Sequence, residues 1–154
     1  LVFVHADCLL PPKWVEPLRD ALDDERTSLA CYRLRTTSAR DRRGSVFSTL
    51  ALRVFDLRSR GSRLPYGDQG FAVRREVFDR VGGFPDQVLM EDIAFARACR
   101  ARGRIRRLPL EMRTTARRLE ERPVRTMLAY STFPTLYRLG VSPTRLAKWY
   151  GDSR

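Results

Sequence analysis

Histidine, cysteine and lysine are scarce in this sequence, and each shortage excludes a class of site. The one histidine, His5, and three widely spaced cysteines, Cys8, Cys31 and Cys99, lack the spacing of a zinc site or a disulfide framework. Such cysteines are typical of reduced thiols in the cytosol. No apolar stretch is long enough to cross a bilayer. We therefore expect a cytoplasmic protein, with at most peripheral contact at the inner face of the cell membrane.

The charge of the chain is strongly positive and comes mostly from arginine. The formal net charge is +12, while Lys13 and Lys148 are the only lysines among 154 residues. Because arginine suits bidentate contact with phosphate, the charge indicates an anionic partner such as a nucleotide, a nucleic acid or a lipid surface. The arginines are spread along the chain, without a basic tail, zinc-finger spacing or RNP-like motif, and this argues against a nucleic-acid partner.

The length predicts one domain, and the apolar spacing predicts an α/β fold in which strands and helices alternate. A continuous apolar run at Leu1–His5 is typical of a strand buried inside a parallel sheet. The other expected strands are Ser28–Leu34, with Leu29 and Cys31 on one face, Phe71–Val73, and one or two strands over Arg104–Thr115. The expected helices are one that starts at Pro11 and Pro12, Val46–Leu57, Arg75–Val81, Glu91–Arg102, Val124–Leu139 broken or kinked at Pro134, and Thr144–Tyr150 after the N-cap residue Ser142.

The first strand ends in a short polar sequence that suggests a ligand site. In open α/β sheets, ligands bind at the carboxyl ends of the strands, which is where His5 and Asp7 lie. A carboxylate at the end of a buried strand is costly unless it is paired or functional, so Asp7 is a candidate ligand for a divalent cation on a diphosphate. His5 could assist it, although a hydrogen-bonded core histidine is the favoured interpretation of this residue.

Two acidic clusters lie in the stretch from Gly67 to Asp92. Asp68 stands between two glycines, which allow a tight turn and close approach to a ligand. Glu91 and Asp92 open a helix, where the dipole favours negative charge. If both clusters faced one pocket, they could supply a general base or a metal site. On residue types alone, a turn and a helix cap are the favoured explanation.

Five motifs in this order resemble those of a known family. They are Val4–Asp7, Gly67–Gln69, Gly82–Asp92, Thr114–Arg118 and Tyr137–Tyr150. Together they are similar to a family 2 glycosyltransferase of GT-A fold, and in particular to a bacterial subgroup often named for arsenosugar biosynthesis or for association with radical-SAM proteins. The resemblance covers essentially the whole chain.

The resemblance implies roles for the matching residues in sugar transfer from a nucleotide-sugar donor to a small-molecule or lipid acceptor. Asp7 resembles the last Asp of the Asp-x-Asp motif, which holds Mn²⁺ or Mg²⁺ on the donor diphosphate, and His5 stands where the first Asp is usual. Asp92 resembles the catalytic base of inverting members, with Glu91 beside it.

The resemblance also assigns residues to the two substrates. It places Gly67, Asp68 and Gln69 on the acceptor side. It places Arg117 and Arg118 near the donor phosphates, in a motif where Thr115 replaces the usual Ser.

The fold implied is a partial GT-A, Rossmann-like fold, with a mostly parallel sheet flanked by helices. Residues 1–122 would form the metal and acceptor part of the domain, and residues 123–154 a helical extension packed on it. Since the family's nucleotide-binding half does not precede Leu1 here, we expect the C-terminal part of a longer protein, inactive or weakly active alone. The alternative is a non-catalytic basic module that uses Val124–Tyr150 at a membrane surface, although core packing is the favoured role for the aromatics of these helices.

Overall fold

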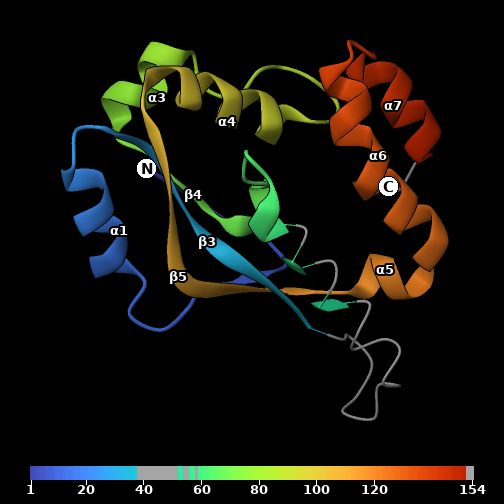
Figure 1. Ribbon diagram of the computed structural model, residues 1–154, viewed down its shortest axis with the longest axis horizontal. Coiled ribbons are helices and arrows are strands. Elements are labelled where there is room, and N and C mark those ends of the chain that lie inside the picture. The colour runs from blue at the N-terminus through green and yellow to red at the C-terminus, as the bar shows by residue number, and fades with distance from the viewer. Residues whose placement is uncertain (38–51, 54–55, 58, 152–154) are drawn as a thin grey trace.

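The computed structural model describes residues 1–37, 52–53, 56–57 and 59–151, which form a mixed α/β fold with a curled sheet (Figure 1). The strands are β1 (Val2–Phe3), β2 (Cys8–Leu9), β3 (Thr27–Thr37), β4 (Phe71–Ala72) and β5 (Arg104–Thr115). The helices are α1 (Val15–Asp23), the 3₁₀ turn η1 (Gly67–Gln69), α3 (Arg75–Val81), α4 (Glu91–Arg102), α5 (Arg117–Glu121), α6 (Pro123–Arg138) and α7 (Pro143–Tyr150).

The sheet corrects the expectation of mostly parallel strands. Its order is β1-β4-β3-β5-β2, and of the described pairings only the central pair, β3 with β5, is parallel. The pairings of β1 with β4, β4 with β3 and β2 with β5 are antiparallel. The parallel pair follows from the crossover through α3 and α4, as parallel strands require. The two-residue strands β1, β2 and β4 instead run antiparallel to their neighbours. An apolar pattern in the sequence does not indicate strand direction.

The first strand is also not buried as expected. β1 has two residues and lies at one edge of the described sheet, where it pairs with β4. The side chains of Leu1, Val2 and Val4 are 39, 41 and 38% exposed. A continuous apolar run indicates burial on both faces, but here the described part of the chain supplies no neighbour beyond β1.

Local signals placed most helices correctly. The expected bounds of α3 and α4 match the structure, because Gly82 adopts the left-handed conformation of a C-cap and Glu91 and Asp92 occupy the first turn of α4. Ser142 caps α7 by accepting a hydrogen bond from the Arg145 N–H. Of the two alternatives predicted at Pro134, a break or a kink, the break is wrong, since α6 continues through this residue. The helix expected at Val46–Leu57 falls mostly outside the described residues.

The core has two layers that sandwich the sheet. Along β3, Leu29 and Cys31 face the layer under α3 and α4, as expected, while Ala30 and Tyr32 face α1. The first layer is centred on buried Phe95, whose ring lies 4.2 Å, centroid to centroid, from that of Phe84. The ring of Phe95 also packs near those of Phe3, Phe71 and Phe78. These layers fix the ends of β3 and β5 relative to the start of α4.

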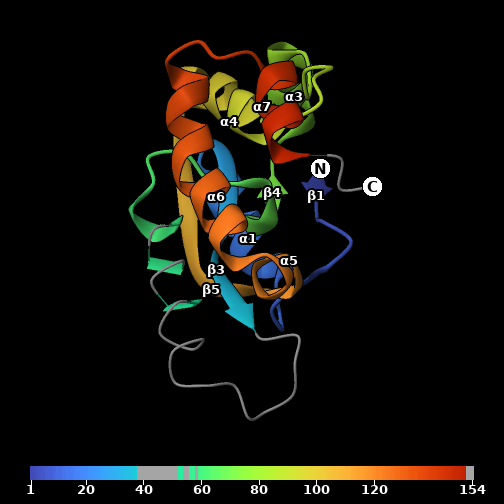
Figure 2. The same cartoon turned by 90° about the vertical axis from the view of Figure 1, so that its right-hand side faces the viewer.

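The C-terminal helices form a third, smaller core. Ala129 and Phe133 of α6 pack with Leu146 of α7, and Leu89 and Met90, just before α4, join them. Figure 1 and the view turned by 90° in Figure 2 both show α6 rising from α5 towards the N-terminal end of α4, with α7 beside it. The helical pair is thus fixed next to Glu91 and Asp92. No helix in the described part of the chain is long and apolar enough to cross a membrane.

Candidate functional site

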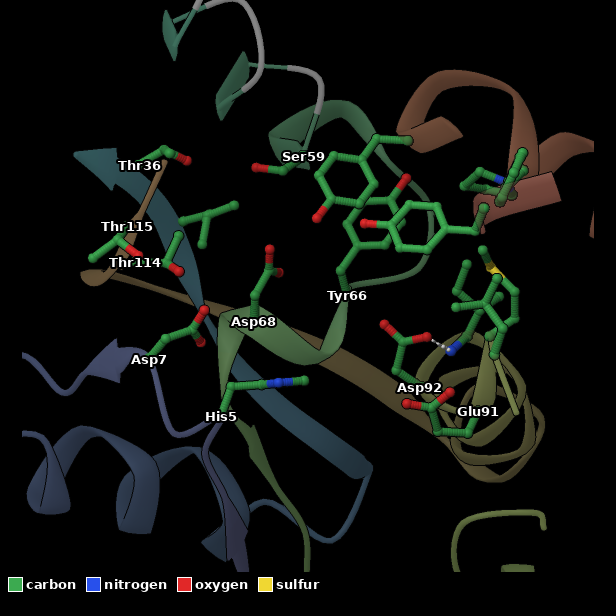
Figure 3. A pocket seen from close by; sticks show the side chains of 18 of the residues that line it. His5, Asp7, Thr36, Ser59, Tyr66, Asp68, Glu91, Asp92, Thr114 and Thr115 are labelled. Atoms are coloured by element: carbon green, nitrogen blue, oxygen red, sulfur yellow. Dashed lines mark hydrogen bonds between the residues drawn. The ribbon is translucent and has the colours of Figure 1, made fainter. Parts of the chain in front are cut away.

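One cavity of about 310 Å³ gathers most of the residues that the sequence singled out (Figure 3). Those on its wall are His5, Asp7, Asp68, Glu91, Asp92, Thr114, Thr115 and Arg117. They come from the β1–β2 connection, η1, the start of α4 and the end of β5, which are far apart in the sequence. A second hollow, of about 340 Å³, adjoins β1 and shares His5, Glu91 and Asp92 with the first.

Asp92 is held in place by two backbone N–H groups. Its Oδ2 accepts a hydrogen bond from the Gly67 N–H at 2.8 Å, and its Oδ1 accepts one from the Ile93 N–H at 2.7 Å. The N-terminal end of α4 adds a favourable dipole for the carboxylate. Because each carboxylate oxygen has two lone pairs, Asp92 can still accept a proton or a hydrogen bond from a ligand in the cavity. Glu91 lies beside it and is partly exposed.

Gly67 allows His5 and Asp92 to approach each other. A Cβ atom at position 67 would lie 2.8 Å from His5 Nε2 and 3.3 Å from Asp92 Cβ, so a side chain there would push both residues away. Gly67 also lines the second hollow. The glycine that the motif contains is therefore explained by close packing between the two acidic clusters.

Gln69 lies beneath the cavity, not on its wall. It is fully buried; its Oε1 accepts from the Tyr66 N–H at 2.9 Å and its Nε2 donates to the Tyr32 carbonyl at 3.1 Å. Both ends of the amide are thus used to join η1 to β3. The acceptor contact that the resemblance implies for Gln69 stays a prediction.

His5 is exposed, so its favoured interpretation as a core histidine is wrong. Its ring extends towards Asp92, while the Asp7 carboxylate points away from it, towards Thr114 and Thr115 (Figure 3). The two side chains therefore diverge. Among the described residues, no group of three His, Cys, Asp or Glu side chains could hold a metal ion. A cation held by Asp7 and His5 stays a prediction.

Cys8 joins the loop of Asp7 to that of Asp68. Its Sγ lies 3.7 Å from Asp7 Oδ1 and 3.5 Å from the Asp68 carbonyl oxygen. Burial raises the pKa of the Cys8 thiol to about 11, and the charges of Asp7 and Asp68 act in the same direction, against a hydrogen bond with Thr114. Cys8 is therefore a neutral thiol at physiological pH and a poor nucleophile. It fixes the two carboxylate-bearing loops on either side of itself.

The structure locates one of the two arginines in the motif Thr114–Arg118. Arg117, at the start of α5, lines the cavity, as do Thr114 and Thr115 at the end of β5. The side chain of Arg118 lies outside the described part of the structure. Arg117 is thus the one member of the predicted arginine pair that the structure locates at the site.

Sequence reasoning missed the aromatic side of this cavity. Tyr66, Tyr130, Phe133 and Tyr150 line it, together with Pro134 of α6. The spacing of Tyr130 and Phe133, three residues apart, places them on one face of a helix and could have signalled this. The sequence does not indicate which element that face contacts.

A buried carboxylate behind the cavity was also missed. Asp56 is 4% exposed, and it accepts hydrogen bonds from the backbone N–H and hydroxyl of Thr36, at 3.0 and 2.7 Å to Oδ1. Burial raises the pKa of Asp56 above its usual value, and the hydrogen bonds from Thr36 oppose this. Thr36 and Ser59, which donates to the Asp56 carbonyl, both line the cavity. Asp56 therefore fixes this end of the wall.

Comparisons of the chain with family models, with curated proteins and with solved structures found no match.

Proposed function

We propose that this chain is the catalytic and acceptor-binding part of an inverting glycosyltransferase of the family 2 type, which uses a nucleotide-sugar donor. The observation that carries the proposal is the placement of Asp92, Asp7, Asp68 and Arg117 around one cavity. The order of the five sequence motifs supports it independently. The parallel pair of β3 and β5 is compatible with a partial GT-A fold.

In the proposed reaction, Asp92 accepts the proton of an acceptor hydroxyl as the hydroxyl oxygen attacks the anomeric carbon of the donor sugar. A bond forms between that oxygen and the anomeric carbon, and the bond from the carbon to the diphosphate oxygen breaks with inversion. The N–H groups of Gly67 and Ile93 hold the carboxylate in a fixed orientation throughout. The leaving diphosphate is stabilised by positive charge. Among the residues that the structure describes on the cavity wall, Arg117 can supply this charge.

A divalent cation at Asp7 stays a prediction. Mg²⁺ is commonly held by one or two carboxylates together with substrate phosphates, so Asp7 would need donor oxygens to complete a site. The side chains of His5 and Asp7 point in different directions (Figure 3). The mechanism above therefore includes no step at a metal.

The proposal is tested by nucleotide-sugar turnover. The protein expressed from its complete reading frame, incubated with a panel of nucleotide-sugars, is expected to release nucleoside diphosphate from one of them by hydrolysis, with water as the acceptor of the sugar. Release is measured by a coupled assay, with and without EDTA, which also tests the predicted use of Mn²⁺ or Mg²⁺. A folded protein that releases no nucleoside diphosphate from any donor, with or without added metal, would contradict the proposal.

A second candidate function, a basic module at a membrane surface, is favoured by one face of α6. Val124, Met127 and Leu128 lie three or four residues apart and are 71, 38 and 59% exposed. Arg122 and Arg125 are exposed beside them. An apolar helical face next to arginines complements a bilayer that contains anionic lipids.

Vesicle flotation tests this second candidate. The chain is expected to float with phosphatidylserine vesicles, and Leu128→Asp with Val124→Asp is expected to lower the floated fraction at least about fivefold, because each change places a charge in the apolar face. Asp79→Asn, at an exposed position of α3, is the control that keeps wild-type flotation. Equal flotation of the double variant would show that charge alone, not this face, mediates binding, and the candidate would fail.

A further inference from the structure

The lining of the main cavity has two chemically different parts. The polar part consists of His5, Asp7, Asp68, Glu91 and Asp92, from the β1–β2 connection, η1 and the start of α4. The other part, called the apolar wall, consists of Leu89, Met90, Tyr130, Phe133, Pro134 and Tyr150. In Figure 3, Asp7, Asp68 and His5 extend into the cavity from one side, while Tyr66 lies beyond them towards α6. The ligand that fills such a space must itself be polar at one end and apolar at the other.

The apolar wall is firmly placed. Phe133 and Tyr150 pack edge to face, with ring centroids 6.1 Å apart, over the buried Leu146. Tyr137 of the same helix contacts α4 and the loop before it, through the Arg97 guanidinium 5.8 Å from its ring and a hydrogen bond with Gln87. These contacts hold α6 at a fixed position relative to Asp92.

The rings of the apolar wall that face the cavity are not completely covered by the helical core. Tyr130 and Tyr150 are partly exposed and line the hollow, while Ala129 and Leu146 complete the packing between the two helices. Aromatic side chains that remain open to a pocket offer a large contact area at a small entropic cost.

We infer that this cavity binds an amphipathic hydroxyl compound, with an alkyl or aryl group against Tyr130, Phe133 and Tyr150 and a hydroxyl near Asp92. The inference deepens the proposed function, on which it rests for the identification of this compound as the sugar acceptor. It assigns to α6 and α7 the selection of the acceptor's apolar group, and it excludes a bare hexose as the preferred ligand. Binding itself does not depend on catalysis.

Binding of two simple glycosides tests the inference without any requirement for turnover. Hexyl β-D-glucoside and methyl β-D-glucoside present the same hydroxyls and differ in five methylene groups. Hexyl β-D-glucoside is expected to bind at least about tenfold more tightly, because part of its chain is buried against the aromatic wall. Titration calorimetry or ligand-observed NMR measures the two affinities. Equal affinities, or no binding of either glycoside, would overturn the inference.

Substitutions in α6 test whether the glycoside binds at the apolar wall. Tyr130→Ala is expected to weaken hexyl glucoside binding about tenfold, while Tyr130→Phe restores it because the ring is kept. Leu128→Ala changes the exposed face of the same helix and is expected to leave the affinity unchanged. Wild-type affinity in a folded Tyr130→Ala protein would overturn the assignment. Tight binding of hexyl glucoside by a wild-type protein that shows no transferase activity would refute the proposed function and leave the amphipathic site standing.

Discussion

Replacement of Asp92 by Asn is expected to lower the rate of sugar transfer by about 10²- to 10⁴-fold, the usual contribution of a general base. The amide cannot accept the proton of the acceptor hydroxyl, although it occupies the same space. Donor binding is expected to persist, because Asp7 and Arg117 lie elsewhere on the cavity wall. Initial rates and donor affinity, measured on the protein from the complete reading frame, separate these two effects.

The hydrogen bonds of Asp92 require a stability control for this variant. Both of its oxygens accept backbone N–H groups, from Gly67 and Ile93, and Asn retains only one acceptor oxygen. One N–H therefore faces an NH₂ group, at an expected cost of about 1–3 kcal/mol in the free energy of unfolding. Glu91→Gln, at the neighbouring carboxylate, is the matched comparison and is expected to have a much smaller effect on rate. Retained turnover in a folded Asp92→Asn protein would refute the assignment of the base.

Phe95→Ala is expected to have the largest effect on stability, a loss of about 3–5 kcal/mol in the free energy of unfolding. Phe95 is fully buried, and its ring contacts Phe84, Phe78 and Phe71, with centroids 4.2, 5.7 and 6.1 Å away. Alanine leaves a cavity at this position that these large rings cannot fill. Since domains have total stabilities of about 5–15 kcal/mol, the variant is expected to lie close to the threshold of folding.

Urea unfolding followed by circular dichroism measures this loss. Val88→Ala is the control, because Val88 is 68% exposed in the loop before α4 and its change is expected to alter the free energy by less than about 0.5 kcal/mol. A loss below about 1 kcal/mol for Phe95→Ala would contradict the central position of this ring in the core.

The sequence predicts the helices well because their signals are local. Gly82 as a C-cap and Glu91 and Asp92 in a first turn act within a few residues, and α3 and α4 have the predicted bounds. The sheet is different. Whether β1 is central or at an edge depends on which strand lies beside it, and the apolar run at Leu1–Val4 carries no information about direction or neighbour.

Some features of the candidate site are likewise visible in the sequence, and others are not. Carboxylates next to glycines or at a helix start are visible in the sequence, and Asp68, Glu91 and Asp92 do lie on one cavity. The orientation of His5, the burial of Gln69 and the aromatic wall depend on contacts between distant segments. For Tyr130 the helical spacing shows a face, but only the packing of α6 against the loop before α4 brings that face to the cavity.

The parallel pairing of β3 with β5 has a consequence for how the protein folds. The hydroxyl of Thr37 donates to the Thr114 carbonyl across 77 positions of sequence, and the pair has similar separations along its length. Closing so long a loop costs entropy before any contact of the pair forms, which makes such topologies slow to fold. The cavity lies at the end of this pair, and we therefore expect the segments that line it to come together late in folding. Partly folded chains are expected to carry the individual motifs but not the site.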